Sequence, residues 1–113
     1  MQTPAVAIIV FNRPEVVRQL LARLAELRPK TLFVIGDGPR PHKPGEAEVV
    51  QAVREQVEKV SWPCEVVTDY AVENRGCRRR VVSGLIWVFG QVQEAIILED
   101  DCLPTPSFMT YAG

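Results

Sequence analysis

Four mainly apolar runs of strand length alternate along the chain with segments whose apolar residues recur at helical spacing. The expected strands are residues 5–11, 31–35, 64–68 and 95–98. Such runs are typical of strands that are buried on both faces of a parallel sheet. The alternation predicts an α/β protein with a Rossmann-like, three-layer α/β/α architecture and a mostly parallel sheet. The 113 residues suffice for one core, so a single domain over residues 1–113 is expected.

The segments between these strands are expected to form three helices. Pro14 marks the start of the first helix, because proline is favoured in the first helical turn. The second and third helices are expected to follow Gly45 and Gly76. The third helix is expected to bury the residues that share one face at helical spacing, which are Val81, Val82, Leu85, Ile86 and Phe89. A short helix capped by Thr105 is expected within residues 104–113.

The polarity of the four strands predicts their order in the sheet. The first run is the most apolar and should be central, whereas the third carries Glu65 in its middle and should lie at an edge. The order 3-2-1-4 satisfies both conditions and creates a topological switch point between the first and fourth strands. Ligands of open α/β sheets bind at the carboxyl ends of the strands at such a point. The polar residues after Phe11, Ile35 and Leu98 are therefore expected to form a site.

Three carboxylates, Glu99, Asp100 and Asp101, follow the fourth apolar run without a break. Adjacent carboxylates repel one another and resist desolvation, so their place at the end of a buried strand indicates a divalent cation. Oxygen ligands, with His42 as the single histidine, favour Mg²⁺ or Mn²⁺. A solvated acidic turn accounts for the same residues without a metal, and both interpretations stay open.

Other polar residues near the expected strand ends also have two interpretations each. Asp37 can accept hydrogen bonds from a nucleobase or ribose, or from its own turn backbone. Arg13 can bind a phosphate or a base at a helix start, or point into solvent. The four arginines within residues 75–80 suit an anion site or a solvated basic face. Cys77, which lies among them, is expected to be a buried thiol.

Several classes of protein are unfavoured by composition and motifs. The net charge of −1 gives no overall field to attract nucleic acid or an anionic membrane, and no apolar run approaches the length of a transmembrane helix. No Walker loop and no GxGxxG follows any expected strand. Cys64, Cys77 and Cys102 lack metal-ligand spacing, which indicates reduced thiols and a cytoplasmic location.

Segments 8–14, 34–39 and 96–101 resemble the nucleotide-sugar half of GT-A-fold glycosyltransferases. They are most similar to enzymes like N-acetylglucosaminyltransferase I and to bacterial nucleotide-diphospho-sugar transferases. Segment 73–89 also resembles the bacterial members, so the resemblance covers nearly all of the chain. It implies a metal-dependent glycosyltransferase that binds a nucleoside-diphosphate sugar, with a UDP-sugar ranked first.

The resemblance also implies roles for individual residues. Asp101 matches the aspartate that contacts Mn²⁺, which in turn holds the donor diphosphate. Glu99 and Asp100 match positions that contact the donor sugar and ribose, and Asp37 matches the position near the nucleobase. The full set expected to bind the nucleotide or sugar is Phe11, Asn12, Arg13, Asp37, Gly38, Asn74, Arg80, Glu99 and Asp100, with Asp101 on the metal.

In these transferases the acceptor site and the catalytic base lie well after the acidic triplet. No catalytic residue is therefore expected within this chain, which is expected to be the N-terminal part of a longer enzyme and inactive alone. The alternative is a non-catalytic α/β interaction module, or a truncated remnant of such an enzyme. With nothing expected beside it, the apolar fourth strand predicts a homodimer through an intermolecular sheet.

Overall fold

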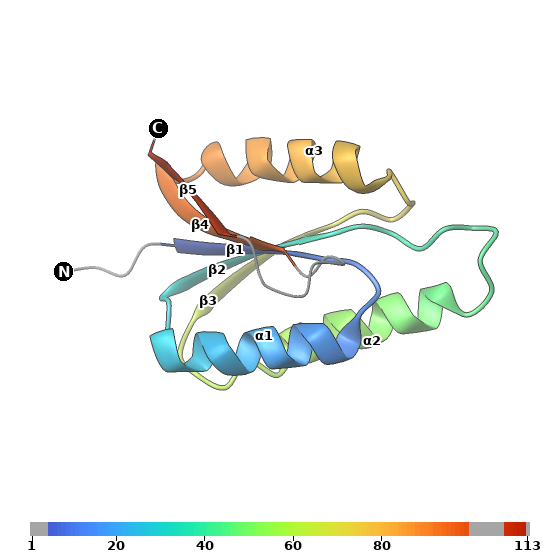
Figure 1. Cartoon of the computed structure of the whole chain (residues 1–113), viewed down its shortest axis with the longest axis horizontal. Coiled ribbons are helices and arrows are strands. Elements are labelled where there is room, and N and C mark those ends of the chain that lie inside the picture. The colour runs from blue at the N-terminus through green and yellow to red at the C-terminus, as the bar shows by residue number, and fades with distance from the viewer. Residues whose placement is uncertain (1–4, 100–107, 113) are drawn as a thin grey trace.

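The computed structural model describes residues 5–99 and 108–112, which form one five-stranded sheet and three helices (Figure 1). In chain order these elements are β1 (Ala5–Val10), α1 (Pro14–Leu27), β2 (Thr31–Gly36), α2 (Glu46–Glu58), β3 (Glu65–Tyr70), α3 (Cys77–Phe89), β4 (Glu94–Glu99) and β5 (Phe108–Ala112). The strand order is β3-β2-β1-β4-β5, and the first four of these strands run parallel. The predicted Rossmann-like α/β fold and the 3-2-1-4 order are confirmed.

The central strands are buried on both faces, and alternate residues supply two cores. Even-numbered residues of β1 and β2, such as Ile8 and Val34, pack with α1 and α2 on one face of the sheet. Odd-numbered residues such as Ala7 and Phe33 pack with α3 on the other face. Figure 1 shows α1 and α2 together below the sheet and α3 alone above it. Because both faces need apolar residues, these strands lack the polar alternation of a half-exposed sheet.

The two helices on the first face are amphipathic. Helix α1 buries Val17, Leu20, Leu21 and Leu24, and α2 buries Val50, Val53 and Val57. The loop after α2 is fixed by Trp62, whose buried indole Nε1 donates a hydrogen bond to the Pro29 carbonyl at 2.8 Å. This bond closes the end of the core opposite the carboxyl ends of the strands.

Helix α3 packs through a face that matches the predicted one only in part. Leu85 and Phe89 pack against the core, as predicted. Val82 and Ile86 are exposed, whereas Arg80, Gly84 and Val88 are the buried residues of the helix. A Cβ atom added to Gly84 would lie 2.4 Å from Cγ2 of Ile35 in β2. The missing side chain of Gly84 therefore allows the helix to approach the sheet closely, and this approach decides which face of α3 is inside.

The segment after β4 also differs from the prediction. Residues 108–112 form β5, which pairs antiparallel with β4 in a register that sets Phe108 opposite Leu98. The predicted short helix is therefore wrong over these residues, and Thr105 lies outside the described residues. Aromatic and β-branched residues favour a strand. Because β5 pairs with the edge of β4, the described structure lacks the exposed edge on which the predicted homodimer depended. At the other side of the sheet β3 is an edge strand, as predicted.

Replacing Gly84 by alanine tests the close packing of α3. Alanine is the better helix former by about 1 kcal/mol, so helix propensity alone would raise the free energy of unfolding. We expect instead a loss of about 1–3 kcal/mol, because the new methyl group overlaps the buried Ile35 side chain. Urea denaturation followed by circular dichroism measures the change. In the Ile35→Ala background, which lacks all three atoms nearest the added methyl group, the loss should shrink, and an equal loss there would contradict this account.

Candidate functional site

A cavity of about 410 Å³ opens where β1, β2 and β4 end and α3 begins. It lies at the switch point between β1 and β4, the position at which open α/β sheets bind ligands. Its lining comes from four separate segments and consists of Ile9, Val10, Phe11, Asn12, Arg13, Asp37, Arg40, Asn74, Gly76, Cys77, Arg80, Val81 and Glu99. Seven of the nine residues predicted to bind a nucleotide or sugar are among them. Gly38 is not in this lining, and Asp100 lies outside the described residues.

The Asp37 carboxylate of this lining accepts four hydrogen bonds. It is 6% exposed, and it accepts hydrogen bonds from the backbone N–H of Gly38 at 2.8 Å and from that of Arg75 at 2.9 Å. The backbone N–H of Gly76 and the side-chain amide of Asn74 donate to its other oxygen, each at 3.2 Å. Four donors fill the roughly four acceptor positions of a carboxylate. Asp37 therefore holds loop 74–76 in place.

This arrangement changes the role predicted for Asp37 and Gly38. The contacts support the interpretation in which Asp37 accepts a hydrogen bond from the backbone of its own turn. The carboxylate also accepts hydrogen bonds from a second loop, which the sequence did not indicate. Gly38 is buried against backbone, since an added Cβ atom would lie 2.7 Å from the Val72 carbonyl oxygen. Asn74 also donates to the Gly38 carbonyl at 3.0 Å. These residues build the wall of the cavity.

Arg80 is a buried structural arginine, with only 2% of its surface exposed. Its guanidinium forms an ion pair of 2.8 Å with the Asp69 carboxylate, donates through Nε to the Gly36 carbonyl at 3.0 Å and through Nη1 to Ser83 at 2.8 Å. These contacts tie the first turn of α3 to the carboxyl ends of β2 and β3. Arg80 borders the cavity as predicted, but most of its donors serve the fold.

The sequence did not indicate the cluster formed by Arg40 and Glu46. Glu46, the first residue of α2, accepts hydrogen bonds from Arg40 Nε at 2.9 Å and Nη2 at 2.6 Å, and from the Asn12 amide at 3.3 Å. The Arg40 guanidinium lies 5.7 Å from the centre of the Phe11 ring. Hydrogen bonds from the Arg40 side chain lower the pKa of Glu46 to about 2. The cluster fixes Phe11, Asn12 and Arg40 along one side of the cavity.

The acidic triplet is described only at its first member. Glu99, the last residue of β4, pairs in register with Ile9 and lines the cavity between β1 and β4. Asp100 and Asp101 lie outside the described residues, so the predicted metal ligand is not tested. Within residues 5–99, no group of three or more histidine, cysteine or acidic side chains is arranged to hold a metal ion.

Cys77 is another residue whose predicted environment is wrong. It is exposed and lines the cavity at the first residue of α3. Gly76, the residue before α3, has a φ of 86°, which lies outside the range favoured by other residues, so the chain turns sharply before Cys77. This turn is what directs residue 77 outward toward the cavity.

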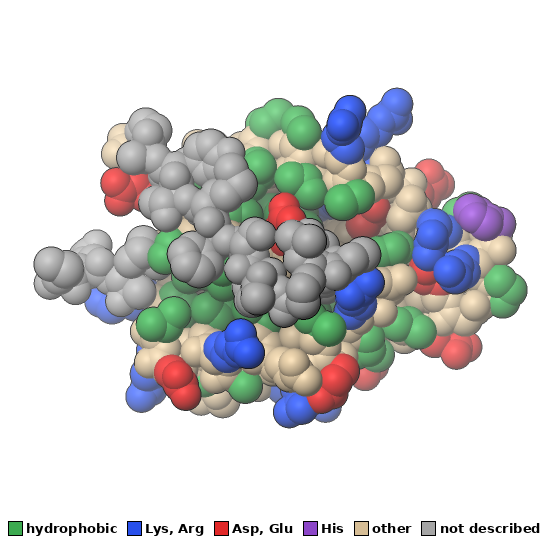
Figure 2. Space-filling view, viewed as in Figure 1, with side chains coloured by type: hydrophobic (Ala, Val, Ile, Leu, Met, Phe, Trp, Pro, Cys, Tyr) green, Lys and Arg blue, Asp and Glu red, His purple; other side chains and the backbone are tan. Residues whose placement is uncertain are grey.

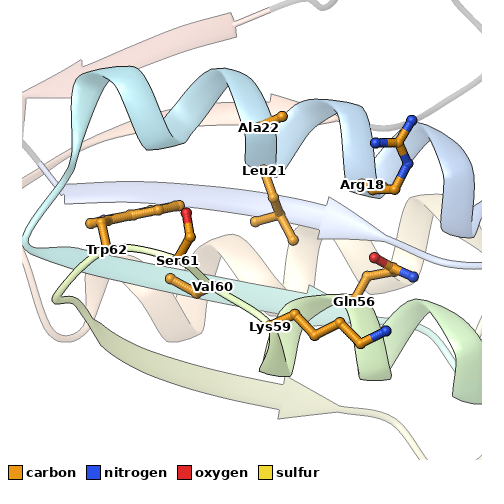
Figure 3. A pocket seen from close by; sticks show the side chains of 8 residues that line it. All are labelled: Arg18, Leu21, Ala22, Gln56, Lys59, Val60, Ser61 and Trp62. Atoms are coloured by element: carbon orange, nitrogen blue, oxygen red, sulfur yellow. The ribbon is translucent and has the colours of Figure 1, made fainter.

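A second hollow, of about 390 Å³, lies between the α1 and α2 helices (Figure 3). Leu21 comes from α1, Gln56 from α2 and Trp62 from the loop that follows α2. Arg18 at its rim pairs with Glu15, and both side chains are more than half exposed. The hollow is remote from the carboxyl ends of the strands, and it gathers none of the residues predicted to bind a ligand. The cavity at the switch point is therefore the candidate site.

No protein-family model matches the chain, and no match was found among curated proteins or among solved structures. No helix formed by the described residues is long and apolar enough to cross a membrane. The assignment of a function therefore depends on the geometry of the cavity and on the residues that line it.

The lowered pKa of Glu46 predicts a pH-dependent contribution to stability. Because the folded-state pKa of about 2 lies below the usual value of 4.5, Glu46 stabilises the fold above pH 4.5 and loses this effect as the pH falls toward 2. We expect Glu46→Gln to lower the melting temperature at pH 7, and the difference from the wild type to shrink between pH 4.5 and 2. Thermal melts across this range measure it. Glu48→Gln, which changes an exposed residue of the same helical turn, should show almost no difference at either pH.

Proposed function

We propose that this chain is the nucleotide-sugar-binding part of a metal-dependent glycosyltransferase, and that the nucleoside diphosphate binds in the cavity at the switch point. One observation carries the proposal. Seven residues that the sequence analysis predicts to bind the nucleotide or sugar, from segments far apart in the chain, line one cavity. Its volume of about 410 Å³ is within the range of small-molecule sites, roughly 300–1,000 Å³.

The chemistry of the lining suits a nucleotide. Phe11 offers an aromatic surface beside the Arg40 guanidinium, an arrangement that can accept the plane of a base. Arg13 and the amide of Asn74 are cavity-lining groups with N–H donors, which phosphate oxygens require. Glu99 supplies carboxylate oxygens that can accept hydrogen bonds from sugar hydroxyls. Apolar contacts come from Ile9 and Val81.

The proposal assigns the cation, Mn²⁺ or Mg²⁺, to Asp101 beside the diphosphate. Its support is that Glu99, two residues earlier, lines the cavity at the end of β4. A bound cation would neutralise the charge that develops on the leaving diphosphate. The chain's own residues bind and orient the donor: Asp37 and Arg80 hold the walls rigid, and Glu99 faces the sugar. The acceptor site and the catalytic base are assigned to residues outside this chain.

The alternative is a non-catalytic α/β module that keeps the same scaffold. Two observations favour this alternative. The Asp37 carboxylate already accepts its full set of hydrogen bonds from the protein, and buried Arg80 forms an ion pair, so both groups stabilise the fold whether or not a ligand binds. The two functions differ in one observable property, which is metal-dependent affinity for a nucleoside diphosphate.

Isothermal titration of the chain with UDP, in the presence and absence of Mn²⁺, tests the proposal. We expect the binding of UDP to require the metal and its affinity to fall at least about tenfold in Asp101→Ala. Removal of a side chain that contacts the metal should lower the affinity no less than removal of a residue that only supports such a side chain. Glu94→Ala, at the exposed opposite end of β4, should bind UDP like the wild type. Absence of binding at millimolar UDP with Mn²⁺, or unchanged binding in Asp101→Ala, would contradict the proposal and favour the non-catalytic module.

A further inference from the structure

Helix α3 carries an exposed face that neither the core nor the proposed site uses. The helix stands alone on its side of the sheet, so its outer face forms a ridge (Figure 1). Two aliphatic side chains on this face, Val82 and Ile86, are 53% and 70% exposed. Residues one turn apart share a helix face, so Arg79, Val82 and Ile86 lie in one stripe with Arg78 beside it. Arg75 precedes the helix, in the loop before its N-terminus. All three of these arginines are exposed.

The charge of this face is unusual for the chain as a whole. The net charge of the protein is −1, yet no acidic residue occurs between Glu73 and Glu94, a stretch that contains four arginines. Arg80 is buried against Asp69, which leaves the other three on the surface. Figure 2 shows hydrophobic and basic side chains next to one another along the top of the molecule, where Figure 1 places α3.

We propose that the outer face of α3 docks onto an anionic lipid surface. Arginines near a bilayer are attracted by anionic headgroups, and aliphatic side chains beside them can enter the interface. Charge complementarity selects this occupant, because α3 exposes Arg78 and Arg79 and contains no acidic residue, and the exposed Arg75 lies just before it. A second copy of the chain would bring like charges together. The convex shape of a lone helix suits a flat lipid surface better than an acidic partner helix, which packs best into a groove between two elements.

The docking surface is distinct from the cavity but adjoins it. The first turn of α3 supplies Cys77, Arg80 and Val81 to the cavity lining, whereas Arg78, Arg79, Val82 and Ile86 do not line it. Docking through the outer face would therefore bring the mouth of the cavity close to the lipid surface. The inference does not rest on the proposed function, since lipid binding and nucleotide binding can be measured separately.

Sedimentation with vesicles tests the inference. We expect the protein to pellet with vesicles of phosphatidylcholine and 30% phosphatidylglycerol at low salt, and to stay in solution with vesicles of phosphatidylcholine alone. The double variant Arg78→Glu, Arg79→Glu should lower the affinity for the vesicles roughly tenfold or more. Each basic side chain near an anionic lipid surface contributes to the free energy of binding. Ile86→Ser should weaken it as well, without a change in the circular dichroism spectrum.

Matched variants on the opposite side of the sheet provide the control. Leu27→Ser on α1 removes an aliphatic side chain that is 65% exposed, close to the 70% of Ile86, and Arg23→Glu reverses an exposed charge on the same helix. Neither should alter vesicle binding. Absence of binding to anionic vesicles, or equal loss in the α1 variants, would overturn the inference. So would binding of α3 to poly-glutamate or to a second copy of the chain in place of vesicles.

Discussion

The carboxylate of Asp37 is the group on which the geometry of the candidate site depends. It follows β2 directly, in the centre of the sheet, and it binds N–H groups of Asn74, Arg75 and Gly76 on the loop before α3. Besides those bonds, the loop is held at the carboxyl end of β2 by the Ala71 N–H, which donates to the Gly36 carbonyl, and by the contact of Asn74 with Gly38. A charge buried at this depth requires several donors, and the loop supplies them. The binding cavity is thus shaped by an interaction that leaves its own carboxylate little capacity for a ligand.

Two further contacts fix the elements around this carboxylate. The Arg80–Asp69 ion pair joins α3 to β3, and the close approach of Gly84 to Ile35 joins α3 to β2. Because Gly84 and Arg80 face inward, the aliphatic residues that would ordinarily be buried, Val82 and Ile86, face outward. The packing that builds the cavity wall therefore also creates the exposed basic and aliphatic ridge of α3.

Most of the fold could be predicted from local sequence, and most of the contacts within the site could not. The apolar runs predicted the parallel strands, and Glu65 identified the edge strand, because burial is reflected in residue type. The face of α3 was predicted correctly at Leu85 and Phe89 but wrongly at Val82 and Ile86. An apolar pattern does not identify a glycine or an arginine as a core residue. Hydrogen bonds between Asp37 and loop 74–76 link residues 37 to 39 positions apart, and no local pattern encodes such pairs. The pairing of Arg40 with Glu46 spans only six positions, but it forms across an irregular loop, whose conformation no helical or strand pattern predicts. An acidic residue at a helix start is in addition favoured by the helix dipole.

Amide hydrogen exchange in the wild type and in Asp37→Asn measures most directly whether this carboxylate builds the site. In the wild type the amides of Arg75 and Gly76 should be protected, since both donate to Asp37. The substitution replaces an acceptor oxygen by an amide nitrogen, so at least one of these amides should exchange much faster, while those of Ile8 and Val34 in the central strands stay protected. Unchanged exchange at Arg75 and Gly76 would show that the loop is held by other means, and would contradict the account.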